Sequence, residues 1–354
     1  MEHEPDASYA LFGTEALLKR LQALTQEMEG VRLAQDMECV HRMRVASRRL
    51  RSALALFGEC LPRKKLADWQ KQIRCITRAL GAARDTDVQV DWLDEILRDL
   101  TDSRHKVGVE RLRLRLRQKR AQLQTDVIQA LDQLAASQTA SEMEQTLRQD
   151  LVQARLNQVK ADSLYVYERA RAAIALRLEE FLAYEGCVRR PEQVEELHAM
   201  RIAAKRLRYT MEVFAPLYED KLEEPLKAAR AAQDVLGDIH DCDVWGQYLP
   251  QFTEEERART LEYFGHTRSF GRLVPGLVYL RQDRQQHRAG RYQEFVEFWD
   301  QTQERDVWGK LRQSLQSHPA TPDEQNPQSA QSDPSPTITD AKRIAGRDQT
   351  SQVP

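Results

Sequence analysis

The sequence predicts an all-α protein built from two related helical halves. The chain of 354 residues contains only 14 Gly and 13 Pro, and it is rich in Ala, Leu, Gln, Arg and Glu, which favour helices. Its apolar residues recur at steps of three and four, which is the period of an amphipathic helix. One block of sequence also occurs twice. With 41% hydrophobic residues, the chain can bury a sizeable core.

The first half is expected to contain several amphipathic helices. The apolar pattern predicts helices over about 14–32, 38–60, 66–80 and 110–134, with a further helix following Asp87. Pro62 ends the second of these, because proline cannot continue a helix interior. Gly81 is expected to end the third, as a C-terminal cap.

The series of helices then restarts after a Gln-, Ser- and Ala-rich crossover at 135–162. Helices are predicted over about 164–184, 191–217 and 224–236, and then to about 308. The segment 314–354 is rich in Pro, Ser, Gln and Asp and has almost no large apolar residues, which predicts a disordered tail. We therefore expect a first half at 8–140, a second half at 141–310 and a tail at 314–354.

The two halves share an internal repeat. Residues 40–57, VHRMRVASRRLRSALALF, align with residues 197–214, LHAMRIAAKRLRYTMEVF, at an offset of 157 (198 − 41). A second block, Leu-Gly followed by Asp-x-Asp-Val, begins at Leu80 and recurs at Leu236, at an offset of 156. Because the blocks keep their order and spacing, the simplest architecture is a duplicated helical bundle.

Each repeat carries a stripe of cations beside its apolar seam. The seam runs along one face of the first repeated helix, and the cations follow the same rhythm one position later, over about 15 Å. The two stripes are His41, Arg44, Arg48 and Arg51, and His198, Arg201, Lys205 and Arg208. No Asp or Glu lies between Cys39 and Gly58, so pairing within this helix is unavailable. A bound polyanion, or acids from other helices, must neutralise these charges.

Further cations recur elsewhere in the chain. Lys71 and Arg74 align with Lys227 and Arg230 at the offset of 156. A second set has the spacing i, i+4, i+7 in each half: Arg113, Arg117 and Arg120, and Arg284, Arg288 and Arg291. We expect these cations to extend the anion site, with pairing to nearby acids as the alternative. Arginine suits such a site because its planar group donates two parallel hydrogen bonds to phosphate oxygens.

The repeated pattern resembles the CHAD domain, a histidine-containing α-helical domain. The resemblance rests on His-x-x-Arg-x-x-x-(Arg/Lys)-Arg-x-Arg followed by Leu-Gly-x-x-x-Asp-x-Asp-Val, in both halves, and covers about 8–310. It implies two four-helix bundles related by a pseudo-twofold axis, with a basic central pore that binds inorganic polyphosphate and associates with polyphosphate granules. It also implies binding without catalysis and no cofactor. Arg49 and Arg206 match the motif but lie off the main stripes.

The same residues also allow other functional interpretations. His41 or His198 could accept phosphate in a histidine phosphotransfer protein, although no general base is evident. The net charge of −2 and the lack of interleaved aromatic residues in the stripes argue against nucleic acid as the ligand. The acids that follow Gly81 and Gly237 are expected to cap helices or pair with arginine and not to bind a metal.

The chain carries no sequence signal for a membrane or for export. No apolar run approaches the roughly 20 residues that span a bilayer, and the start, MEHEPD, lacks an apolar signal segment. We therefore expect a cytoplasmic protein with no membrane partner.

Overall fold

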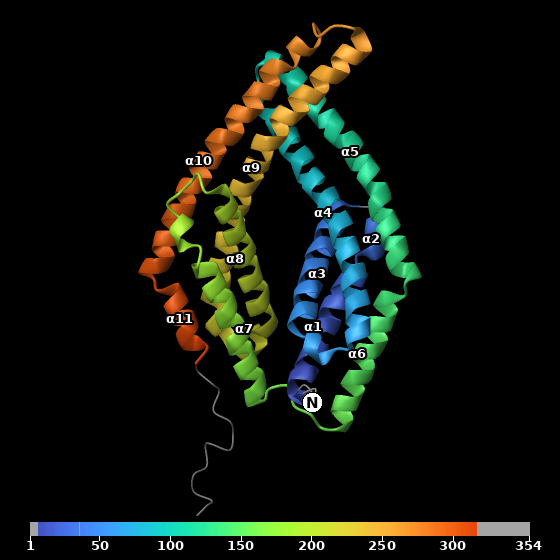
Figure 1. Cartoon of the computed structure of the whole chain (residues 1–354), viewed down its shortest axis with the longest axis vertical. Helices are drawn as coiled ribbons and strands as arrows, with labels where there is room; N and C mark the ends of the chain where they lie inside the picture. The colour runs from blue at the N-terminus through green and yellow to red at the C-terminus, as the bar shows by residue number, and fades with distance from the viewer. Residues whose placement is uncertain (1–5, 35, 317–354) are drawn as a thin grey trace, which may run out of the picture. The chain divides into compact units, whose positions relative to one another are not determined.

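The computed structural model describes residues 6–34 and 36–316, and within these ranges every regular element is a helix (Figure 1). This confirms the predicted all-α class. The described residues belong to one compact unit. None of the described helices combines the length and the apolarity that crossing a membrane requires. Of the predicted tail, Ser314 is the last residue of a helix, and 317–354 lie outside the described residues.

The first half contains six α-helices, and α3 lies between α1 and α4. α4 packs against α5, and α6 packs against α1. Asp6 and Asp36 begin α1 and α3 as side-chain N-caps, which satisfy amide groups that have no partner within the helix. The elements are α1 (Ala7–Thr25), α2 (Met28–Arg32), α3 (Met37–Leu56), η1 (Gly58–Cys60), α4 (Arg63–Asp99), α5 (Ser103–Ala136) and α6 (Thr139–Leu156).

The second half contains five α-helices in a similar succession. α8 packs against α7 and α9, and α9 packs against α10. Ser163 caps α7 by accepting a hydrogen bond from the Val166 amide. The elements are α7 (Leu164–Leu182), η2 (Glu185–Cys187), α8 (Val194–Phe214), η3 (Ala215–Leu217), η4 (Glu219–Leu222), α9 (Glu223–Phe264), η5 (Phe270–Arg272), α10 (Val274–Glu304) and α11 (Val307–Ser314).

Two predicted helix ends are wrong. α4 continues without a break through Gly81, where the sequence predicted a C-terminal cap, and α9 continues through Gly237, although a helix was predicted to end at 236. A glycine cap needs left-handed backbone, and among the described glycines only Gly265 has a positive φ. The acids that follow Gly81 and Gly237 therefore lie inside helices, so they do not cap them.

The segment between the repeats is mostly helical. The expected boundary between 140 and 141 falls in the first turn of α6, and residues 157–163 connect α6 to α7 without a helix. The predicted helix at 14–32 is interrupted at Gln26 and Glu27, where α1 gives way to α2.

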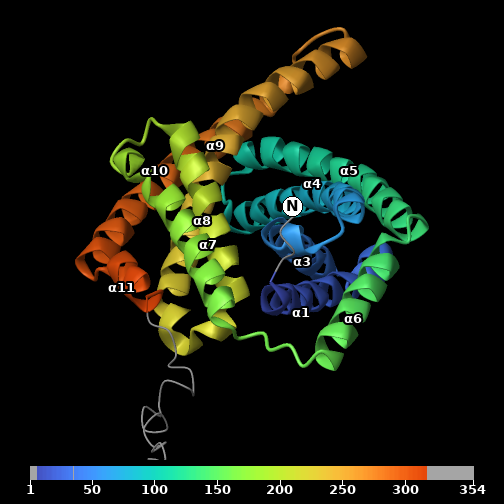
Figure 2. The same cartoon turned by 60° about the horizontal axis from the view of Figure 1, so that its bottom comes forward.

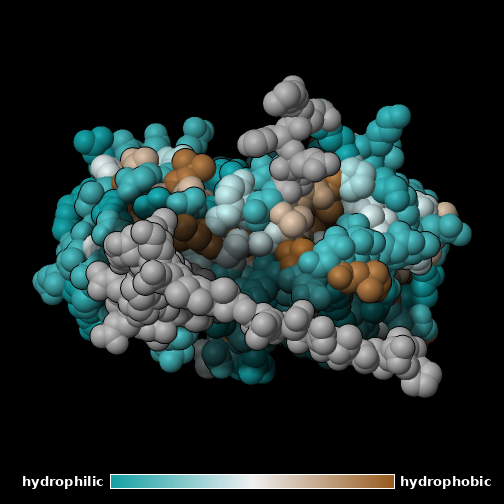
Figure 3. All heavy atoms as spheres, turned by 90° about the horizontal axis from the view of Figure 1, so that it is seen from below, coloured by the Kyte–Doolittle hydropathy of each residue, from teal (hydrophilic) through white to brown (hydrophobic). Residues whose placement is uncertain are grey.

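One continuous apolar core runs through both halves. The halves join within it at the end where α1 begins. Phe57 of the first half and Phe214 of the second are fully buried, with ring centroids 6.0 Å apart. Phe12 stacks on Phe214 at 5.6 Å. Burying each large aromatic side chain contributes about 1.5–3 kcal/mol. Viewed from this end, the described surface is mostly hydrophilic, and apolar side chains appear only in small clusters (Figure 3).

A second core forms where the far ends of α4 and α5 meet α9 and α10 (Figures 1 and 2). Trp92 and Trp245, one from each half, have ring centroids 4.7 Å apart. α5 and α10 approach closely at Gly108 and Gly276: a Cβ added to Gly108 would lie 3.0 Å from the Cα of Gly276. Only glycine permits such an approach of two helix backbones. The aromatic contacts around Phe214 and this second core therefore join the halves at two separate places.

Candidate anion-binding site

The helices that carry the basic stripes, α3 and α8, contact each other between these two places (Figure 1). Their apolar seams point into their own halves, where Met43 and Leu50 of α3 and Met200 and Leu207 of α8 are fully buried. Because each stripe lies beside its seam, burial of the seam fixes the rotation of the helix. That rotation carries the stripe to the boundary between the halves.

Four cations from the two stripes come together there. Burial, followed by Arg48, Arg201 and Arg44, lowers the pKa of Lys205 from its ordinary 10.5 to about 7. Burial likewise lowers the pKa of Arg44, and the nearby Arg48 lowers it further. The pKa of Arg201 is lowered by burial and by Arg44, although Asp241 opposes this. Cations from both repeats therefore share one electrostatic environment.

Two acids at equivalent repeat positions, Asp85 and Asp241 (241 − 85 = 156), lie at this cluster. Asp85 accepts a hydrogen bond from Arg44 at 2.9 Å. Burial raises the pKa of Asp241 to about 6, against the lowering effect of Arg201. The Nε atoms of Arg44 and Arg201 are buried and have no acceptor among the described residues. The cluster thus keeps an excess of positive charge and unused donors.

Each stripe histidine lies beside an arginine. Burial and Arg84 lower the pKa of His41, and burial and Arg201 lower that of His198. The Nδ1 atoms of His198 and His240 are 2.9 Å apart, and burial with Arg201 lowers the pKa of His240 to about 4. His240 occupies the repeat position of Arg84 (240 − 84 = 156). His41 therefore has Arg84 of α4 as its neighbour, and His198 has His240 of α9.

The outer members of the stripes differ in their partners. Arg51 and Arg74 are close enough for Arg74 to lower the pKa of Arg51, which burial also lowers. Lys71 lies one turn from Arg74 on the exposed side of α4. Arg208 lies on the buried side of α8, 3.7 Å from the carboxylate of Glu212.

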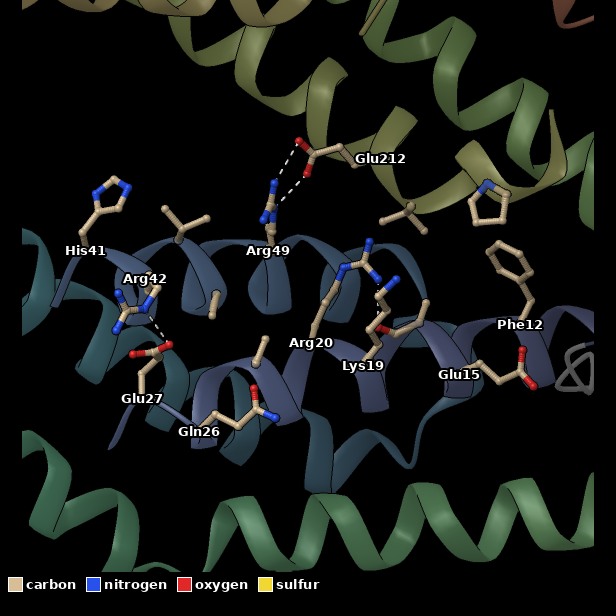
Figure 4. A pocket seen from close by; sticks show the side chains of 16 residues that line it. Phe12, Glu15, Lys19, Arg20, Gln26, Glu27, His41, Arg42, Arg49 and Glu212 are labelled. Atoms are coloured by element: carbon tan, nitrogen blue, oxygen red, sulfur yellow. Dashed lines mark hydrogen bonds and ion pairs between the residues drawn. The ribbon is translucent and has the colours of Figure 1, made fainter. Parts of the chain in front are cut away.

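The off-stripe residue Arg49 also reaches Glu212, to which it donates two hydrogen bonds at 2.9 and 3.2 Å (Figure 4). Arg206 is exposed and has no acidic partner among residues 6–34 and 36–316. Arg49 and Glu212 line a cavity of about 750 Å³ between α1, α3 and α8, and Arg20 and His41 also belong to its wall (Figure 4).

The remaining predicted cations already have carboxylate partners, so for them the structure supports the alternative of pairing with acids. Arg113 and Arg117 share Asp94 at 2.7 and 2.9 Å. On α9, Lys227 and Arg230 pair with acids one turn away. The other pairs are Arg120 with Asp87, Arg284 with Asp283, Arg288 with Asp243, and Arg291 with Asp238 and Glu294.

Two of these pairs are equivalent in the repeat. Asp87 pairs with Arg120 at 2.6 Å, and Asp243 pairs with Arg288 at 2.5 Å. They confirm that the Asp-x-Asp block pairs with arginine. They also set the register of α5 against α10 at 168 (288 − 120), which is the offset of Gly276 from Gly108. Aligning the two arginine sets by their spacing gives an offset of 171 (284 − 113) instead. The structural register therefore differs from that alignment by three residues.

Sequence reasoning missed several residues of the site. It treated Asp85 and Asp241 as helix caps or arginine partners, gave no role to Arg84, and did not consider Glu212. The repeat itself contained a signal for Glu212, since this acid replaces the residue that the first repeat has at the same position, Ala55.

The comparisons with known proteins identify the family. Residues 15–250, more than half of the chain, match the model of the CHAD domain family, and the chain belongs to that family. The crystal structure of the CHAD domain from the plant Ricinus communis is similar to this chain, with 26% sequence identity and a TM-score of 0.55. That similarity covers 82% of this chain and 95% of the plant chain. No match was found among curated proteins.

Proposed function

We propose that this protein binds inorganic polyphosphate along the facing stripes of α3 and α8, and that it binds without catalysing a reaction or using a cofactor. The observation that supports this most directly is the clustering of Arg44, Arg48, Arg201 and Lys205 with few acids to neutralise them. Buried cations at such close range are unfavourable unless an anion balances them. Family membership supports the same ligand.

The chemistry of the cluster favours an extended polymer of phosphates. Each stripe extends over about 15 Å of helix, from His41 to Arg51 and from His198 to Arg208. A single nucleotide would contact only part of this length, whereas a chain of regularly spaced charges can contact all of it. Free Nε donors on Arg44 and Arg201 can form charge-assisted hydrogen bonds to phosphate oxygens.

We further propose that the halves at 8–140 and 141–310 are four-helix bundles related by a pseudo-twofold axis, with the stripes lining a basic central pore. The sequence repeat supports this arrangement. The equivalent pairs Asp87–Arg120 and Asp243–Arg288 support it as well. The approach of Gly108 to Gly276 joins two equivalent positions, as expected at a twofold axis.

Calorimetric titration with long-chain polyphosphate at two salt concentrations tests the function. We expect tight binding that weakens linearly with salt on logarithmic axes, because bound phosphates release counterions. The double variant Arg44→Ala/Arg201→Ala should lose roughly two to four orders of magnitude in affinity, at about 1.5–3 kcal/mol for each charged hydrogen bond. Unchanged affinity would rule out the proposed site.

A matched control uses Arg148→Ala/Arg155→Ala, which removes the same charge from the exposed side of α6. It should bind nearly as well as the parent chain. Equal losses in both double variants would mean that net charge alone governs binding. Competition with a single-stranded oligonucleotide would show whether nucleic acid is also a ligand.

Histidine phosphotransfer is the second candidate function. Burial lowers the pKa of His41 and of His198, and this favours the neutral ring, which is the nucleophile. Incubation with a small phosphodonor, followed by detection of acid-labile phosphohistidine, separates the two functions. We expect no labelled protein.

In cells, we propose that the protein is cytoplasmic and associates with polyphosphate granules and their proteins, which a fluorescent fusion would show by co-localisation.

A further inference from the structure

One carboxylate lies among three arginines at the edge of the basic cluster. Glu212 of α8 accepts two hydrogen bonds from Arg49 of α3 and lies 3.7 Å from the Nε of Arg208. It also raises the pKa of Arg20 of α1, which burial lowers. The only hydrogen bond that Arg20 donates within the described chain goes to the Ala16 carbonyl, at 2.9 Å. Three guanidinium groups from three helices thus surround a single anionic group.

The repeat lacks this acid at the equivalent position. Glu212 aligns with Ala55, just as Arg206 and Arg208 align with Arg49 and Arg51 (212 − 55 = 157). Ala55 is exposed on α3, and neither Arg51 nor Arg206 has a carboxylate partner in the described part of the chain. The two stripes therefore have nearly the same cations. Of the two equivalent edges, the one at Arg208 has an acid, Glu212, and the one at Arg51 has Ala55 in its place.

We propose that Glu212 is an internal competitor that occupies a phosphate position between Arg20, Arg49 and Arg208. This inference rests on the proposed polyphosphate function. A polyanion binds first at the open edge, at Arg51 and Arg206, and must displace Glu212 to extend along the other edge. The acid thereby gives a duplicated site a direction, and it favours long chains, which can displace it, over short ones, which bind only at the open edge.

Two substitutions test the proposal from opposite sides. Glu212→Gln removes the charge but keeps the size of the side chain and an acceptor for Arg49. It should tighten binding of long-chain polyphosphate by roughly 10-fold, since an acid facing a bound anion is repulsive. It should leave binding of tripolyphosphate unchanged. Ala55→Glu adds the missing acid at an exposed position, and it should weaken binding of both ligands by a similar factor.

The alternative is that Glu212 only clamps the two halves through Arg49. A clamp predicts that Glu212→Gln lowers the thermal unfolding temperature and leaves the affinity for long chains unchanged or weaker, and this result would overturn the proposal. If the parent chain binds polyphosphate while Glu212→Gln binds it no more tightly, only the proposal on Glu212 fails. If the parent chain does not bind polyphosphate, the proposed function fails with it.

Discussion

Lys205 should take up a proton when polyphosphate binds. It lies at the repeat position of Arg48 (205 − 48 = 157), and burial with its arginine neighbours lowers its pKa to about 7. At pH 8, roughly a tenth of the unbound chains would carry a charged Lys205. Bound phosphates reverse the local field and return the pKa toward its ordinary 10.5. Binding should therefore take up roughly 0.9 proton at pH 8 and roughly 0.1 at pH 6.

The sign of the pH dependence follows from this uptake. Because binding and protonation favour each other, affinity should fall as the pH rises above 7, by up to roughly 10-fold per pH unit, and change little from Lys205 below pH 6. Asp241, whose pKa is raised to about 6, also takes up protons near the phosphates, but mostly below pH 7. The Lys205 contribution is therefore distinct at pH 8.

The assay is calorimetric titration at pH 8 in two buffers of different ionisation enthalpy, which gives the number of protons taken up. Lys205→Arg is the matched variant, because arginine keeps its charge at this pH and is the residue that the first repeat has. The parent chain should take up roughly one proton more than the variant. Equal uptake in the two proteins would refute the position of Lys205 at the bound anion.

Two further predictions concern the frame that holds the stripes. Gly276→Ala should destabilise the protein by about 1–3 kcal/mol in urea unfolding, because the new Cβ would lie 2.2 Å from the His105 carbonyl oxygen. Gly290→Ala, on the same helix with nothing within 4 Å, should instead stabilise it by up to about 1 kcal/mol, and equal losses would contradict the close approach. Asp87→Ala should cost about 3 kcal/mol, because it leaves Arg120 without its buried partner; a loss below 1 kcal/mol would show that water replaces the pair.

Much of this architecture could be predicted because its signals are local. Helical periodicity and the repeat at offsets of 157 and 156 were enough to predict an all-α chain of two related halves. Local signals failed at Gly81 and Gly237, which resemble caps in sequence. There the Asp–Arg pairs and the cores on either side hold α4 and α9 continuous, and the propensity cost of one glycine is only about 1 kcal/mol.

By itself, the sequence determined which side chains line each helix face, because the α-helical period converts spacing along the chain directly into direction around the helix. That was sufficient to place Arg44 and Arg201 on equivalent stripes. Only the tertiary structure decided which cations stay unpaired, because the partners come from distant segments: Arg120 finds Asp87, and Arg49 finds Glu212, 163 residues away. Charge balance depends on distances across the packed core, which no local pattern encodes.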